Sequence, residues 1–177
     1  MQRFILTLAA TTFVGTSAEN LNHLIEALNT SERSYMIYRS YEMSTQGKRH
    51  TCLYTTKENL TRAEYWFLQD FMAGSMGYQH RLHAKLGDDG RDPYMTVDNI
   101  PAPPGMSSTT LSIQYRLKHW NSNDKCAVFT LYLSPGQIQC ELHKWKSRID
   151  EPQESCDWWY KNLCQNRKHE VYSKDCP

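Results

Sequence analysis

The feature that most constrains the fold is a strict alternation of apolar and polar side chains across residues 109–118. The apolar face of this segment comprises Leu111, Ile113, Tyr115 and Leu117. Successive side chains of a β-strand point to opposite faces, so the pattern predicts a strand with one face on an apolar interior and the other in water. Antiparallel sheets are built from strands of this kind.

Similar extended segments follow one another along most of the chain. Further strands are predicted at residues 35–42, 50–55, 61–71, 78–86, 126–133 and 138–145, with a last extended piece at 170–172. The spacing of apolar residues predicts a short helix over 19–29, and a second helix is expected over 151–163. The proline-rich stretch at 100–105 is interpreted as a long loop.

A succession of seven or eight antiparallel strands leaves open edges unless the sheet closes on itself. The predicted fold class is therefore mainly β: an eight-stranded antiparallel up-and-down barrel with a short N-terminal helix and a C-terminal α-helix. The interior of such a barrel can hold one small ligand. A two-sheet sandwich also satisfies the alternation, although the C-terminal helix fits it less naturally.

The N-terminus predicts the compartment. Residues 1–18 combine one early positive charge, an apolar stretch and small residues before a cleavage point, which is typical of a secretory signal peptide. We expect the mature chain, residues 19–177, to be a single domain that is secreted and extracellular. A net charge of +1 predicts no general affinity for nucleic acid or for a membrane surface.

Six cysteines in an oxidising compartment predict three disulfides, and fifteen pairings are open to them. Their spacing to histidines does not match a zinc site, and we expect no metal and no cofactor. Two sequons predict N-glycosylation at Asn29 and Asn59. We find no nucleophile–base pattern and no phosphate-binding glycine loop, so an enzyme is not predicted.

Five segments, in their order and spacing, resemble a known family. They are residues 34–41 (SYMIYRSY), 50–53 (HTCL), 126–128 (CAV), 140–142 (CEL) and 171–176 (VYSKDC). Together they are similar to the salivary lipocalins of ticks, whose best-known members are histamine-binding proteins. The resemblance implies the disulfides Cys52–Cys176, Cys126–Cys156 and Cys140–Cys164.

The sequence departs from that family at the positions that bind amines. Amine-binding members carry aspartate after the first cysteine of a Cys-Asp-aliphatic segment, where this chain has Ala127. They carry tryptophan or tyrosine after Glu-Leu, where this chain keeps Glu141 but has His143. Arg39 shares a strand face with Tyr41, which matches a pocket tyrosine of the family. Because a buried ammonium needs a carboxylate partner, the missing acids disfavour histamine or serotonin.

The remaining inward positions favour a hydrophobic ligand such as a sterol, a fatty acid or an eicosanoid. The predicted ligand-binding residues are Ile37, Arg39, Tyr41, Tyr65, Phe67, Leu82, Leu111, Ile113, Tyr115, Leu117, Phe129, Leu131 and Glu141. The same side chains could instead simply fill a small barrel.

The resemblance implies modulation of host immune or inflammatory responses, and the japanin-type branch of the family, which carries a sterol, fits a chain without the amine signature. Two alternatives stay open. One is scavenging of a biogenic amine. The other is surface binding to a host immune-cell or complement protein.

Overall fold

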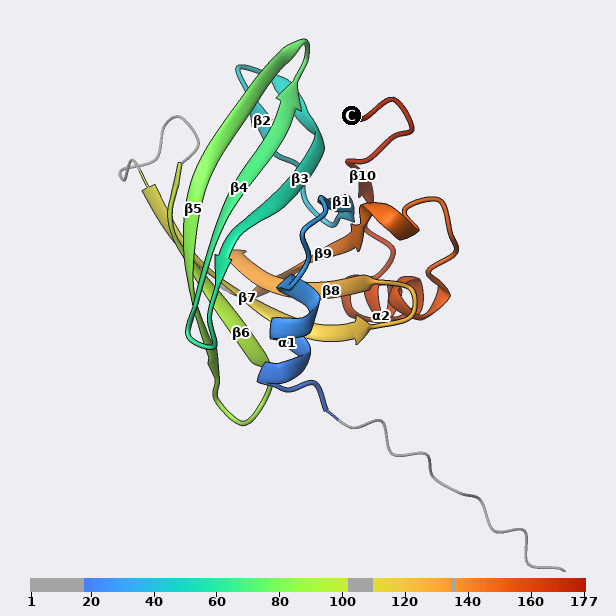
Figure 1. Cartoon of the computed structure of the whole chain (residues 1–177). Helices are drawn as coiled ribbons and strands as arrows, with labels where there is room; N and C mark the ends of the chain where they lie inside the picture. Colours follow the sequence, from blue (N-terminus) through green and yellow to red (C-terminus); the bar gives the residue numbers. More distant parts are fainter. Residues whose placement is uncertain (1–17, 102–109, 135) are drawn as a thin grey trace, which may run out of the picture.

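The computed structural model describes residues 18–101, 110–134 and 136–177. Within them, eight antiparallel strands form a closed barrel, and two two-residue strands flank it (Figure 1). The strands are β1 (Ser34–Arg39), β2 (Ser44–Thr45), β3 (Lys48–Leu60), β4 (Glu64–Ala73), β5 (Met76–Asp88), β6 (Pro93–Pro101), β7 (Thr110–Asn121), β8 (Cys126–Ser134), β9 (Gln137–Trp145) and β10 (His169–Glu170). The predicted barrel is confirmed, and the sandwich is excluded.

The barrel closes at β1, which pairs with β9 on one side and with β3 on the other. The β1–β3 pairing covers only Ser34↔Thr55 and Tyr35↔Tyr54. Beyond it, the C-terminal segment lies between the two strands. The Val171 N–H donates to the Ile37 carbonyl at 3.0 Å, and the Cys52 N–H donates to the Val171 carbonyl at 2.7 Å. The C-terminal segment therefore completes the barrel wall.

The short helix α1 (Leu21–Leu28) covers one end of the barrel, called the helix end below (Figure 1). Asn20 caps it, because its side-chain oxygen accepts the N–H groups of residues 22 and 23. Leu24, Ala27 and Leu28 are buried in the same cluster as the inward residues of the strands. The helix thus contributes its apolar face to the barrel interior.

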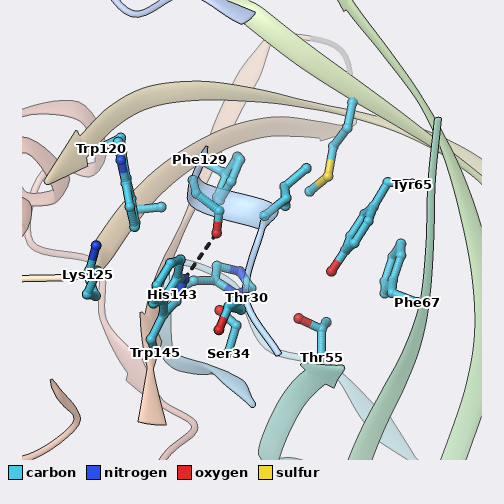
Figure 2. A pocket seen from close by; sticks show the side chains of 14 residues that line it. Thr30, Ser34, Thr55, Tyr65, Phe67, Trp120, Lys125, Phe129, His143 and Trp145 are labelled. Carbon is cyan, nitrogen blue, oxygen red and sulfur yellow. Dashed lines mark hydrogen bonds between the residues drawn. The ribbon is translucent and has the colours of Figure 1, made fainter. Parts of the chain in front are cut away.

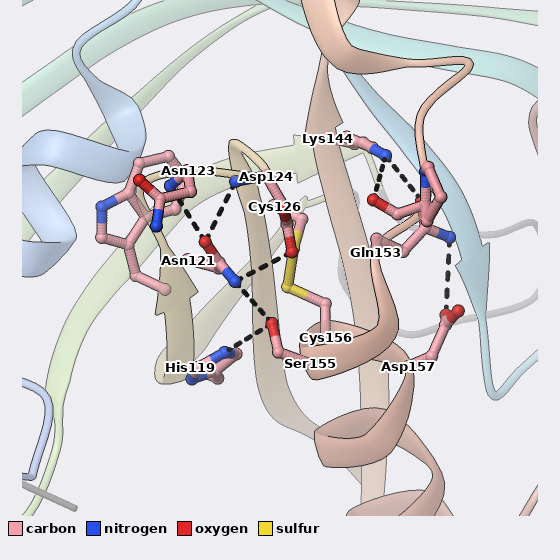
Figure 3. The surroundings of a disulfide bond; sticks show 12 residues. His119, Asn121, Asn123, Asp124, Cys126, Lys144, Gln153, Ser155, Cys156 and Asp157 are labelled. Carbon is pink, nitrogen blue, oxygen red and sulfur yellow. Dashed lines mark hydrogen bonds between the residues drawn. A yellow bond between two sulfur atoms is a disulfide. The ribbon is translucent and has the colours of Figure 1, made fainter.

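The second helix, α2 (Glu154–Cys164), packs on the outside of the barrel against β1, β8 and β9. Its buried contacts include Tyr160, whose ring lies edge-on 4.6 Å from that of Tyr38. Trp159 packs against this cluster, whereas Trp158 is 60% exposed. The fully buried Lys144 donates to the Glu151 carbonyl and to the Gln153 side chain, which fixes the loop that leads into the helix (Figure 3).

The sequence did not predict the two-residue β2 or one strand of the barrel itself. Residues 93–101 form β6, so Ile100 and Pro101 belong to a strand rather than to the predicted loop, while 102–105 lie outside the described residues. The alternation in β6 is short, begins at a proline and is broken by a register shift between Val97 and Ile100, which hides it. The predicted signal peptide also falls outside the described residues, except for Ala18.

Three disulfides join the C-terminal region to three different strands. Cys52–Cys176 reaches β3, Cys126–Cys156 reaches β8 and Cys140–Cys164 reaches β9. These are the pairings that the family resemblance implies. All six cysteines are bridged, as expected for an oxidising compartment.

The bridges are expected to differ in their contribution to stability. Replacing Cys52 and Cys176 together by serine opens a loop of 124 residues, which lowers the free energy of unfolding by about 5 kcal/mol in the chain-entropy estimate. The Cys140→Ser/Cys164→Ser pair opens a loop of 24 residues, and the loss is about 3.5 kcal/mol. Guanidinium unfolding of both double variants measures the difference, and the reverse order would contradict it.

Candidate functional site

The barrel interior is the candidate site, and aromatic side chains dominate it. Tyr65 and Phe67 of β4 are buried there and stack with ring centroids 4.6 Å apart. The interior cluster also contains predicted ligand-binding residues from three other strands, Leu82, Leu117 and Phe129, and Tyr115 packs against it. Leu111 and Ile113 lie on the same face of β7 as Tyr115 and Leu117, and Leu131 lies on the same face of β8 as Phe129. Leu131 is fully buried.

A small cavity of about 40 Å³ lies inside the barrel near the helix end. Figure 2 shows Tyr65 and Phe67 on one side of it and Trp120, Lys125 and Trp145 on the other. Its lining consists of Ala27, Leu28, Thr30, Ser34, Thr55, Tyr65, Phe67, Met95, Trp120, Lys125, Ala127, Phe129, His143 and Trp145. This volume is far below the roughly 300 Å³ or more of a typical ligand pocket, so a drug-sized ligand does not fit this cavity unless the side chains that line it move.

A buried polar cluster adjoins the cavity, and we define it as Arg39, Tyr41, Tyr115, Glu141 and His143. Glu141, only 3% exposed, is its centre. One carboxylate oxygen accepts the Tyr41 hydroxyl, and the other lies 2.8 Å from His143 Nε2. His143 also lines the cavity, so it connects the two parts of the site.

Arg39 brings a positive charge into the same cluster. Its side chain is 2% exposed, and its guanidinium carbon lies 5.1 Å from the centroid of the Tyr41 ring. One terminal nitrogen is 3.4 Å from the Met43 carbonyl oxygen. Its buried Nε has no hydrogen-bond partner among the described residues. An unpaired buried donor is costly, which makes this N–H a candidate contact for a ligand.

The electrostatics keep the two phenols of the cluster neutral. Burial raises the pKa of Tyr41 and of Tyr115 well above the usual value for tyrosine, and the charge of Glu141 raises both further. Arg39 acts in the opposite direction on both groups. Both hydroxyls therefore remain hydrogen-bond donors at physiological pH.

This arrangement favours an electron-rich group over a cation. Both oxygens of Glu141 already have partners, whereas Arg39 has an unused donor. An incoming ammonium group would find the buried carboxylate engaged and a guanidinium nearby. A carboxylate, carbonyl or hydroxyl oxygen could instead accept the Arg39 Nε–H.

One predicted site residue is placed wrongly. Ile37 packs against the cluster beneath α2, outside the barrel, rather than facing the interior. A register shift between Met36 and Tyr38 breaks the alternation of β1, so its inward and outward positions change there. Arg39 is buried and beside Tyr41, as the sequence predicted.

The sequence reading also missed several interior residues. Met95 and Val97 belong to the overlooked β6. Trp120 reaches the interior because a register shift between Leu117 and His119 changes the face of the last residues of β7. Trp145, at the end of β9, packs against the same cluster and donates its indole N–H to the Ala27 carbonyl at 3.1 Å.

Among the described residues, no group of three or more histidine, cysteine, aspartate or glutamate side chains could hold a metal ion. No helix among them has the length and hydropathy needed to cross a membrane.

Comparison with known proteins shows which family the chain belongs to. The model of the family described as "Tick histamine binding protein" matches residues 15–177. This chain belongs to the tick histamine-binding protein family. Its members are non-enzymatic binding proteins, which agrees with the absence of a catalytic pattern in the sequence. The resemblance read from the five sequence segments is thereby confirmed.

A solved structure of the same fold is japanin from Rhipicephalus appendiculatus bound to cholesterol. It has 13% sequence identity to this tick lipocalin and a TM-score of 0.56. The match covers 85% of this chain and 98% of japanin. At this identity the likeness shows the barrel fold alone. No curated protein sequence matches the chain.

His50, at the far end of the interior from α1, gives a testable pH dependence. Burial, together with the charges of Arg39 and His80, lowers its pKa to about 4. The unfolded chain binds a proton at this residue below pH ~6.5, whereas the folded protein resists protonation until about pH 4. The free energy of unfolding should therefore fall by up to about 3 kcal/mol between these pH values.

The His50→Gln variant should lose this part of the pH dependence, measured by urea unfolding at pH 7 and pH 4. The matched control His169→Gln replaces a more exposed ring and should keep it. An unchanged pH dependence in His50→Gln would contradict the assignment.

Proposed function

We propose that this tick lipocalin binds a small, mainly hydrophobic ligand in its barrel and, as a secreted protein, modulates host immune or inflammatory responses. The ligand class is a sterol, a fatty acid or an eicosanoid: an apolar body with one or two oxygen-bearing groups. The observation that carries this proposal is the polar cluster, where Arg39 has an unused buried donor and both oxygens of Glu141 already have a partner.

The shape of the lining supports the same class. Aromatic and aliphatic side chains surround the polar cluster, so an apolar body would be buried against them and its oxygen atoms would reach Arg39 or Tyr115. Cholesterol in japanin is an example of such a ligand in a barrel of the same fold.

The packed interior sets a condition on binding. Because the cavity measures only about 40 Å³, a sterol or fatty acid must displace side chains to enter. Met95 is flexible, and Tyr65 and Phe67 line the same cavity, so these three are the side chains we expect to move. The apolar surface of the ligand that is removed from water on binding would offset the free-energy cost of that rearrangement.

The packed interior also favours a second candidate function, in which the protein acts through its surface. Its partner would be a host immune-cell or complement protein. Tyr132, Leu133 and Ile138 are 55%, 43% and 38% exposed on the β8–β9 hairpin, and they offer an apolar contact there. The amine alternative has less support, since the Ala127 and His143 positions provide no free carboxylate.

Native mass spectrometry of the secreted protein, with extraction of any bound molecule, tests the ligand proposal. Cholesterol or a fatty acid should co-purify, or should be taken up when the delipidated protein is incubated with cholesterol or arachidonic acid. Histamine binding without uptake of either lipid would establish the amine alternative. Binding of none of the three would leave the surface function as the surviving candidate.

A substitution tests the role of Arg39 directly. Arg39→Met keeps much of the side-chain volume but removes the buried donor, so we expect retention of the bound lipid to fall at least tenfold. Arg81→Met is the matched control, because Arg81 is 73% exposed and pairs with Glu58 on the surface. Equal retention by Arg39→Met and wild type would overturn the proposed head-group contact.

A further inference from the structure

A second cation lies against the interior, at the helix end. Lys125 Nζ is 4.8 Å from the centroid of the Trp145 ring and 5.8 Å from that of Trp120. The two indole rings lie 5.5 Å apart, tilted by 41° (Figure 2). Indole faces attract ammonium groups strongly, so this ring pair is a cation-binding site whose occupant is the chain's own lysine.

The backbone fixes Lys125 in this position. Its carbonyl accepts the Trp145 N–H at 3.0 Å, which ties the lysine to the strand that carries one of the rings. Its φ angle is +52°, in the left-handed region that glycine and asparagine adopt more readily than lysine. The chain therefore places a long cationic side chain where backbone geometry alone would favour a short one.

The turn before Lys125 is held by Asn121 (Figure 3). The Asn121 side-chain oxygen accepts the N–H groups of Asn123 and Asp124 at 2.9 and 3.0 Å. Its amide nitrogen donates to Ser155 at the start of α2, at 2.7 Å. Because the turn is anchored at Asn121 and at Lys125, it holds the lysine side chain against the two indole rings.

The site is continuous with the cavity. Lys125, Trp120 and Trp145 all line it, together with Ala127 and His143. Lys125 is half-buried, so its side chain forms part of the wall between the cavity and the solvent. Trp120 is 7% exposed, and its Nε1 has no partner among the described residues, which leaves a donor available to a ligand.

We propose that Lys125 is the resident cation of an ammonium-binding site and that it determines the ligand selectivity of the barrel by excluding free amines. An amine entering the ring pair would lie beside the lysine ammonium, and two like charges repel strongly where solvent screening is weak. Removing the lysine side chain would leave both ring faces open to a primary ammonium ion. This inference rests on the ring pair and is independent of the hydrophobic ligand proposed above.

Chemical rescue tests the proposal, because n-butylammonium has the structure of the missing lysine side chain. Lys125→Gly suits the positive φ angle and removes the resident cation. Isothermal titration and tryptophan fluorescence should show that this variant binds n-butylammonium at least tenfold more tightly than the wild type does. The neutral analogue 1-butanol should show no such gain, since the rings would attract the charge rather than the alkyl chain.

Two controls separate the site from general effects. Lys125→Arg keeps a cation at the rings and should bind n-butylammonium no better than the wild type. Lys146→Gly removes a lysine that lies 5.2 Å from the Tyr35 ring at an exposed position, and it should also gain nothing.

One result would overturn the proposal: a folded Lys125→Gly protein, as judged by near-ultraviolet circular dichroism, whose affinity for n-butylammonium stays within tenfold of the wild type. If Lys125→Gly does not fold, Lys125→Asn tolerates the same backbone angle and takes its place, with the same criterion.

Discussion

The closure of the barrel between β1 and β3 is the constraint on which the rest of the structure depends. The two strands share only two pairs of residues before they separate, and the C-terminal segment occupies the space beyond. Val171 bonds to both strands, and Cys52–Cys176 fixes the segment covalently. A barrel wall that needs its last residues to be complete explains why the disulfides concentrate there: each one holds part of the C-terminal region on a different strand.

Closure also determines what the interior polar groups can do. Inside a sealed barrel, charged side chains cannot rely on water, so they must find partners among themselves. Glu141 does so through Tyr41 and His143, whereas Arg39 is only partly satisfied. At the helix end, the Trp120 and Trp145 rings are the partners of the Lys125 ammonium group. Among the described residues, Arg39 and Lys125 thus bring two positive charges to the interior and its wall, and the Glu141 carboxylate already has partners, a balance opposite to what an amine ligand requires.

Much of the fold followed from the sequence because its signals were local. The alternation across β7 placed Leu117 in the core, and the cysteine count required bridges in any fold of this compartment. Apart from the missed β6, the predictions that failed involve shifts of one residue. A register shift in β1 turned Ile37 outward, and another in β7 turned Trp120 inward. Alternation cannot reveal such shifts, because each changes the face of every residue that follows it.

By itself, the sequence determined a succession of antiparallel strands with a helix near each end, and it shows Ala127 and His143 where the family resemblance places the residues of an amine site. Each of these depends on local periodicity or on the identity of single residues. The tertiary structure alone decided how full the interior is, which donors remain unpaired and that Lys125 lies against two tryptophans. Those properties depend on the distances between side chains from strands far apart in the chain, and only the closed barrel sets these distances.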